Sequence, residues 1–217
     1  SGATNISPIP VTVTFSEEIV DFTAANITVS GGNIDNLQTT DNTVFTVDVT
    51  NPVEGDITLY IPQNTTFDYS ANGNNASNLF SLTYDVTAPT VFVESDNGNF
   101  VNTEPFPITI IFSEYVYNFD ITDIDIGTGT VINFNDSGNP EFTADIDVVT
   151  GPVDVTIDVQ AGVAYDAASN NSSALDVVET VTYNTGAPTV IVSSDGGEYT
   201  NVNPAPVTIT FSEEMTG

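Results

Sequence analysis

The chain repeats itself with a period near 98 residues, and this repeat limits the fold more than any other feature of the sequence. The string PVTVTFSEE returns as PITIIFSEY and again as PVTITFSEE, with its phenylalanine at Phe15, Phe112 and Phe211. The spacing is 97 residues between the first two and 99 residues between the last two. A period of this length is too long for a solenoid unit, and it matches the size of one small β-sandwich domain.

Within each unit, apolar and polar residues alternate with a period of two. Val11, Val13 and Phe15 alternate with threonines, and the segment 153–159 alternates valine and isoleucine with aspartate and threonine. This alternation is typical of strands with one buried face and one solvated face, and no stretch shows the periodicity of a helix. Ala-Pro, Asn-Pro and Gly-Pro steps separate the segments as turn signals.

The middle unit holds enough strands for a complete sandwich. Its pattern predicts seven strands, near 89–94, 107–112, 122–126, 131–135, 141–149, 153–160 and 177–183. We therefore expect an all-β chain of tandem immunoglobulin-like Greek-key β-sandwich domains, with about seven strands per repeat and without the Cys…Trp…Cys core of antibody domains. The predicted domains are residues 1–87, a repeat lacking its first strand, residues 88–186, a complete repeat, and residues 187–217, the first two strands of a third.

The charge of the chain excludes several classes of function. The sequence has 30 Asp and Glu residues and no Lys, Arg, His or Cys, for a net charge of −30. Without basic side chains it has nothing to neutralise phosphates, so we expect no binding of nucleic acid. Without His, Cys or Lys it lacks the usual nucleophile–base pairs, zinc ligands and disulfides, so we expect no enzyme. No apolar run approaches about 18–20 residues, so we expect no direct membrane insertion.

Three motifs of the repeat together carry a resemblance to a known family. They are a strand ending in the FSE of residues 15–17, an acidic loop rich in Asn and Gly at 68–75, and the YDVTAPT linker at 84–90. With these motifs the chain resembles the bacterial Ig-like tandem repeats of very large surface adhesins and extracellular fibres. The resemblance implies an extracellular, cell-surface location, a tandem spacer role, and calcium that often rigidifies the junctions between domains.

Strand order predicts where acidic groups would meet. If the first strand of a unit runs away from its N-terminal end, the loops after the second and sixth strands return to that end, where the linker also enters. In the middle unit this brings Asp85, Glu114, Asp166 and Asn170 to one domain junction. Their oxygen atoms suit calcium, which takes six to eight oxygen ligands. The counterparts elsewhere are Glu17, Glu18 and Asp68 in the first unit and Asn184, Glu213 and Glu214 at the next junction.

Several acidic motifs also have a plain structural explanation. The candidate metal residues could instead cap their loops as solvated Asx turns without any metal. The loop that starts at Asp68 begins like an EF-hand, but its twelfth position is Leu79 and strands flank it. Asp136 begins a D-S-G motif that has no second copy, so we expect a hairpin turn rather than an aspartic-protease dyad. The adjacent Glu17 and Glu18 diverge at a strand end and do not form a glycosidase pair.

These observations favour a non-catalytic structural spacer, a stalk repeat of a bacterial cell-surface adhesin or extracellular filament, stiffened by calcium at its junctions. Its partners would be neighbouring repeats of the same chain, and exposed strand edges would also allow self-assembly into fibres. One alternative is a recognition module that binds a glycan or protein. A cluster of exposed aromatics in one unit would favour it, and Tyr115 and Tyr117 are the hint of one. Another alternative is an accessory Ig-like domain beside the catalytic domain of a secreted enzyme.

Overall fold

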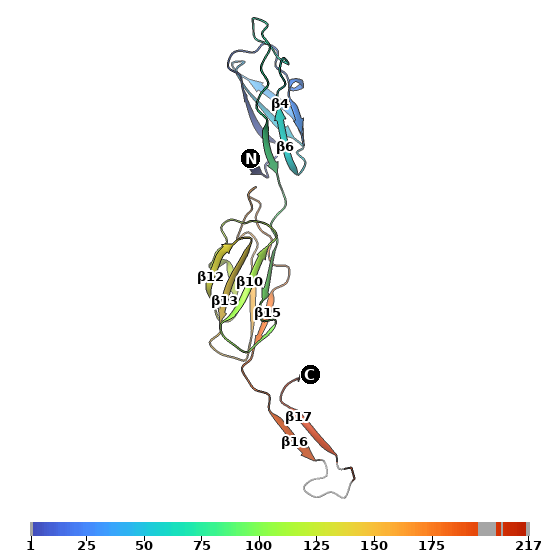
Figure 1. The fold of residues 1–217 in the computed structure, drawn as a ribbon, viewed down its shortest axis with the longest axis vertical. Coiled ribbons are helices and arrows are strands. Elements are labelled where there is room, and N and C mark those ends of the chain that lie inside the picture. The colour runs from blue at the N-terminus through green and yellow to red at the C-terminus, as the bar shows by residue number, and fades with distance from the viewer. Residues whose placement is uncertain (1, 195–202, 205, 216–217) are drawn as a thin grey trace.

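Two β-sandwiches and a β-hairpin follow one another along an elongated molecule (Figure 1). The computed structural model describes residues 2–194, 203–204 and 206–215. We call the first sandwich unit one (residues 2–87) and the second unit two (residues 88–186). The strands of both units run roughly along the long axis of the molecule, so the loops of each unit gather at its two poles.

Unit two is a sandwich of two four-stranded sheets. The first sheet has the order β12-β13-β10-β8 and the second the order β11-β14-β15-β9. Paired strands are antiparallel except β9 and β15, which are parallel. The chain crosses repeatedly between the sheets, and the predicted all-β sandwich fold is confirmed. The strands are β8 (Val91–Ser95), β9 (Phe100–Val101), β10 (Phe106–Phe112), β11 (Ile124–Ile126), β12 (Thr130–Gly138), β13 (Glu141–Asp147), β14 (Val153–Val159) and β15 (Glu179–Tyr183).

The alternation in the sequence becomes the core of unit two. Every second residue of β10, from Phe106 to Phe112, is at most 1% exposed, and the residues between them are partly exposed. Phe112, Phe119 and Phe142 pack edge to face, with ring centroids 4.9 to 5.9 Å apart. Full burial of each such side chain contributes roughly 1.5–3 kcal/mol to stability, so this apolar interior holds the two sheets together.

Unit one repeats this architecture with one difference. Its sheets have the orders β1-β7-β6-β3 and β2-β5-β4. β2 corresponds to β10 but is bonded along one edge only, because no strand of the described residues takes the place that β8 has in unit two. A groove of about 390 Å³ with apolar residues in its lining runs along this edge. The strands are β1 (Ala3–Thr4), β2 (Ile9–Thr14), β3 (Thr28–Ser30), β4 (Asn33–Thr39), β5 (Val44–Thr50), β6 (Gly55–Tyr60) and β7 (Phe80–Tyr84).

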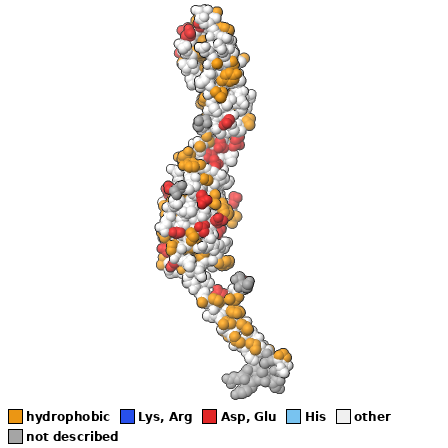
Figure 2. All heavy atoms as spheres, in the orientation of Figure 1, with side chains coloured by type: hydrophobic (Ala, Val, Ile, Leu, Met, Phe, Trp, Pro, Cys, Tyr) orange, Lys and Arg blue, Asp and Glu red, His pale blue; other side chains and the backbone are white. Residues whose placement is uncertain are grey.

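The third copy of the repeat begins with a hairpin of β16 (Val190–Ser194) and β17 (Val207–Phe211). Val190 pairs with Phe211 as Val91 pairs with Phe112 in unit two, so the hairpin reproduces the β8–β10 pair. Its apolar side chains are exposed, and they form the hydrophobic surface near the lower end of the molecule (Figure 2).

The shortest elements have no signature in the sequence. β1 and β9 are two residues long, and each pairs in parallel with the last strand of its unit. Such short strands carry no alternation that a sequence pattern could show. Each unit also has a single 3₁₀ turn, η1 (Ala24–Asn26) and η2 (Ile121–Asp123), and the Asp120 side chain caps η2 by accepting from the Thr122 N–H at 2.7 Å. No helical segment among the described residues is long and apolar enough to cross a membrane.

Candidate functional site

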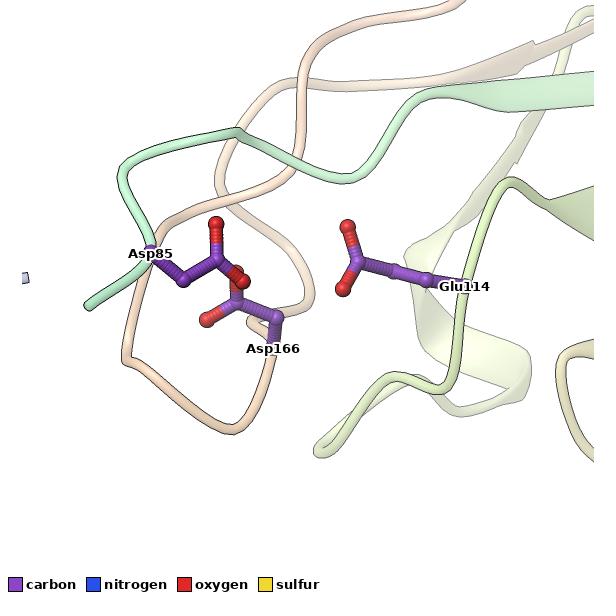
Figure 3. Close-up of side chains that lie close together, drawn as sticks. All are labelled: Asp85, Glu114 and Asp166. Carbon is purple, nitrogen blue, oxygen red and sulfur yellow. The ribbon is translucent and has the colours of Figure 1, made fainter. Parts of the chain in front are cut away.

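Three carboxylates meet where unit one joins unit two. Asp85 lies on the linker after β7, Glu114 follows β10, and Asp166 belongs to the loop between β14 and β15. One oxygen atom from each lies within 4.8 Å of the other two. The three side chains approach from different segments and point toward one another (Figure 3). The strand order therefore delivers the carboxylates to one pole of unit two, as the sequence predicts.

Asp166 is held rigidly by its own loop. Its Oδ1 accepts hydrogen bonds from the N–H groups of Ala168 and Asn170, each at 2.8 Å, and its Oδ2 accepts from the Asn170 Nδ2 at 2.8 Å. The residue is only 1% exposed. A carboxylate offers about four lone-pair positions, so three are taken by the loop and one remains. The loop thus fixes a buried negative charge beside the linker.

Asn170 connects the two units. Besides its bonds to Asp166, its Nδ2 donates to the backbone oxygen of Asp85 at 3.0 Å. Its Oδ1 accepts from the Nδ2 of Asn5, which lies directly after β1 of unit one, at 3.0 Å. The Asp85 N–H donates to the Thr4 oxygen at 3.0 Å, so the linker is also tied to unit one. The junction is therefore a continuous network and not a free tether.

Glu114 is the electrostatically unfavourable member of the cluster. Burial raises its pKa above the ordinary value, and the negative charges of Asp166 and then Asp85 raise the pKa further. No N–H or O–H group of the described residues donates to its carboxylate. Acidic side chains gather at this level of the molecule (Figure 2), and the sequence contains no Lys, Arg or His to neutralise them. Any positive charge that offsets this cluster therefore comes from outside the chain, as a proton or a dissolved cation.

The chemistry of these donors fits a hard divalent cation. The side chains at the junction offer carboxylate oxygens and no nitrogen or sulfur ligand of the kind that zinc prefers. Calcium accepts carboxylate oxygens in a flexible shell of six to eight ligands. Asp85, Glu114 and Asp166 would hold such an ion, and Asn170 bonds to the Asp166 carboxylate and to the Asp85 backbone.

The counterparts in unit one form only part of this arrangement. Asp68 accepts from the N–H groups of Ser70 and Asn72 and from the Asn72 Nδ2, each at 2.8 Å, as Asp166 does in unit two. The Asn72 side chain, followed by its N–H, lowers the pKa of Asp68. Glu17 and Asp68 both border the groove beside β2, and Glu18 is exposed. Among the described residues, no third carboxylate joins them.

At the next junction the linker carries an amide, Asn184, where the first junction has the carboxylate of Asp85. The Nδ2 of Asn184 lies 3.4 Å from the Oε2 of Glu213, so the linker again meets the residue after the second strand. The Gly186 N–H donates to the Asn184 Oδ1 as the Thr87 N–H donates to Asp85. Glu214 is exposed. The described residues thus bring together Asn184 and Glu213 with one negative charge instead of three.

The remaining acidic motifs have local structural roles, and the D-S-G motif expected in a hairpin turn belongs to β12, with the turn following at residues 139–140. The loop from Asp68 is closed by its own Asx hydrogen bonds, and Asp136 lies exposed in β12 near the hairpin that leads to β13. Sequence reasoning missed Asn5, because its place at the junction depends on the unpredicted strand β1. It also missed Tyr165, whose ring stacks on that of Tyr117. The isolated bridge that pairs these two tyrosines has no signature in the sequence.

Comparison with known proteins identifies a family. A family model described as a bacterial Ig-like domain matches the chain twice, over residues 4–84 and 85–184. No curated protein sequence matches the chain. Among solved structures, the broadly conserved Escherichia coli adhesin FdeC is similar at 14% identity and a TM-score of 0.36, over 96% of this chain and 63% of that one. SGBP-B of the Bacteroides ovatus mixed-linkage glucan utilization locus, in complex with a mixed-linkage heptasaccharide, is similar at 15% identity and a TM-score of 0.27.

The SGBP-B match covers 88% of this chain and 44% of that one, so the chain spans less than two thirds of either structure. The two ranges of the family model meet between Tyr84 and Asp85. The linker carboxylate of the junction cluster is thus the first matched residue of the second domain.

Proposed function

The chain belongs to the family of bacterial Ig-like domains, and on this premise we propose that it is a non-catalytic spacer in a bacterial cell-surface adhesin or extracellular filament. The family membership confirms the resemblance found in the sequence. The observation that carries the proposal is the junction itself. Two sandwiches stand end to end, and Asn170, in a loop of unit two, bonds to the linker at Asp85 and to Asn5, the residue after β1 of unit one.

Calcium is the proposed stiffening element of this junction. A bound calcium ion would supply two positive charges that balance the carboxylates of Asp85, Glu114 and Asp166. Since Asp85 lies on the linker and the other two belong to unit two, binding fixes the direction in which the linker enters unit two. Without the ion, mutual repulsion of three carboxylates within 4.8 Å favours a looser junction.

The charge of the whole chain supports the same role. Thirty carboxylates without a basic partner repel one another along the molecule, which favours an extended array over a collapsed one. This repulsion is screened beyond about 8 Å in physiological salt, so it acts mainly between neighbouring surfaces at the junctions. A proposed extracellular location fits, because millimolar calcium would be present there to occupy sites of modest affinity.

Calorimetric titration combined with small-angle X-ray scattering tests the proposal on the full chain. We expect calcium to bind and to make the scattering-derived maximum dimension longer and better defined than in a chelator. Asp85→Asn should weaken the binding and leave the molecule flexible, because it removes the only linker ligand. Glu17→Gln is the matched control, since it removes a carboxylate from unit one away from this junction. If calorimetry shows no heat of calcium binding and the scattering is the same in calcium and in chelator, calcium does not stiffen the junction.

A further inference from the structure

An exposed cluster of tyrosines lies on unit two beside the junction. Tyr115, Tyr117 and Tyr165 are 56%, 44% and 38% exposed, which is unusual for three large rings in contact. The rings of Tyr115 and Tyr117 meet edge to face at 5.2 Å, and those of Tyr117 and Tyr165 stack at 5.7 Å. The backbones of Tyr117 and Tyr165 exchange hydrogen bonds of 2.8 and 3.2 Å, so the cluster is pre-organised.

The repeat provides an internal comparison for this surface. Residues 15–22 read FSEEIVDF in unit one, and residues 112–119 read FSEYVYNF in unit two. Two tyrosines thus replace a glutamate and a valine, and Asn118 replaces an aspartate. Unit two has exchanged two negative charges for neutral groups at this pole while gaining two aromatic rings. A domain that acted only as a spacer would need none of these changes, because unit one folds without them.

A small open cavity adjoins the rings. It has a volume of about 220 Å³, and its lining includes Tyr115, Tyr117, Asn118, Asp136 and Asn139. Asn139 holds the tyrosine segment in place, since its Oδ1 accepts from the Val116 N–H at 3.1 Å and its Nδ2 donates to the Val116 oxygen. Asn118 and Asp136 are exposed at the rim. Aromatic faces next to a few fixed polar groups are the usual composition of a small-molecule site.

We propose that this cluster is a binding platform for a neutral glycan. The C–H face of a pyranose ring stacks on a tyrosine ring, and its hydroxyl groups would bond to the amide of Asn118 and the carboxylate of Asp136. Tyrosine suits this use because it offers a large rigid surface at small conformational cost. Two observations favour a neutral ligand. Unit two has fewer acidic groups here than unit one, which disfavours a basic partner, and the net charge of −30 repels sialylated or sulfated glycans. The platform goes beyond the spacer role and does not depend on calcium.

The test begins with the full chain on an array of neutral, sialylated and sulfated oligosaccharides, followed by titration of the best neutral ligand. The double variant Tyr115→Glu/Tyr117→Val should lower its affinity at least about 10-fold, as expected for removal of central aromatic contacts. This variant carries the residues that unit one already has, so it is expected to fold. The matched control Phe67→Ala, at the Tyr165 position of unit one, should bind like the wild type.

Two results support the platform and three overturn it. Binding of a neutral glycan that is lost in the double variant supports it, as does quenching of tyrosine fluorescence by that glycan in the wild type alone. Absence of binding to every neutral glycan overturns it. Binding that survives the double variant overturns it by placing the site elsewhere. Tyrosine-dependent binding of a basic peptide such as oligoarginine, without glycan binding, overturns it in favour of a cation–π surface.

Discussion

Replacing Glu114 with glutamine removes one charge from the junction cluster and keeps the size of the side chain. In a chelator we expect this variant to be more stable than the wild type, because the Asp85 and Asp166 carboxylates lie within 4.8 Å and no basic residue offsets them. Two unit charges 4.8 Å apart repel by about 0.9 kcal/mol in water. Glu114 is partly exposed, so the aqueous value applies, and two partners give about 1–2 kcal/mol after screening. For a domain of this size, that corresponds to roughly 4–16 °C in melting temperature.

Calcium should offset much of the benefit of the substitution. Extracellular calcium modules bind with dissociation constants of about 10⁻⁴ to 10⁻³ M. At about 10 mM calcium, a wild-type site of that affinity gains roughly 1.4–2.7 kcal/mol from binding. The variant has lost one charged ligand, so we expect its calcium-induced shift to be less than about half that of the wild type.

The pH dependence of stability provides an independent test of the same repulsion. The pKa of Glu114 is raised above 4.5 by burial and by the neighbouring carboxylates, so the folded protein holds this proton more tightly than the unfolded chain. The penalty for ionising Glu114 is absent below the unfolded pKa and grows as pH rises through the folded pKa. In a chelator, the wild type should therefore lose stability relative to Glu114→Gln as pH rises above about 4.5.

Differential scanning calorimetry of the full chain, in calcium and in chelator at a series of pH values, measures all three effects. Glu17→Gln is the control, because Glu17 has the same place in unit one but no linker carboxylate among the described residues beside it. A Glu114→Gln variant that melts below the wild type in chelator would refute the repulsion argument. Equal calcium shifts in variant and wild type would refute the assignment of Glu114 as a ligand.

Two further substitutions test the junction and the core. Asn170→Ala removes the bonds to Asn5 and Asp85, so we expect a broader distribution of interdomain angles in small-angle scattering, whereas the equivalent Asn72→Ala in unit one should leave that distribution unchanged. Phe112→Ala should destabilise unit two by about 3–5 kcal/mol in urea unfolding followed by tyrosine fluorescence, because the ring is 1% exposed among other phenylalanines. Phe15 is the counterpart of Phe112 in unit one, and it is partly exposed beside the open edge of β2. Phe15→Ala should therefore lower the free energy of unfolding clearly less than Phe112→Ala does.

Most of the fold could be predicted because the repeat and the alternation are independent signals that agree. The alternation over 153–159 became β14, and the string around Phe112 became β10 at the centre of its sheet. β1 and β9 could not be predicted, since two residues are too few to show a period. Their pairing is decided by the packed sandwich, which holds each of them against the last strand of its unit.

The strand topology predicts which carboxylates meet at the candidate site, but it does not predict the residues that hydrogen-bond around them. Counting which loops return to one pole is enough to place Asp85, Glu114 and Asp166 together, without any knowledge of side-chain positions. Asn5 could not be found that way, because its contact with Asn170 crosses between units and depends on how one is set against the next. The difference between the two junctions, with Asn184 where the first has Asp85, is visible in the sequence, but its pairing with Glu213 is not.

The parallel pairing of β9 with β15 has a mechanical consequence. The chain enters unit two just before β8 and leaves it just after β15, so a pull on the two ends acts along the strands. Backbone bonds between strands lie across that direction, and the Phe100–Thr182 and Val101–Tyr183 pairs are loaded together in shear instead of opening one after another. Unit one has the same clamp between β1 and β7. In an array of such units, tension along the chain would therefore load these terminal strand pairs in shear, and each sandwich would resist extension until its pair separates.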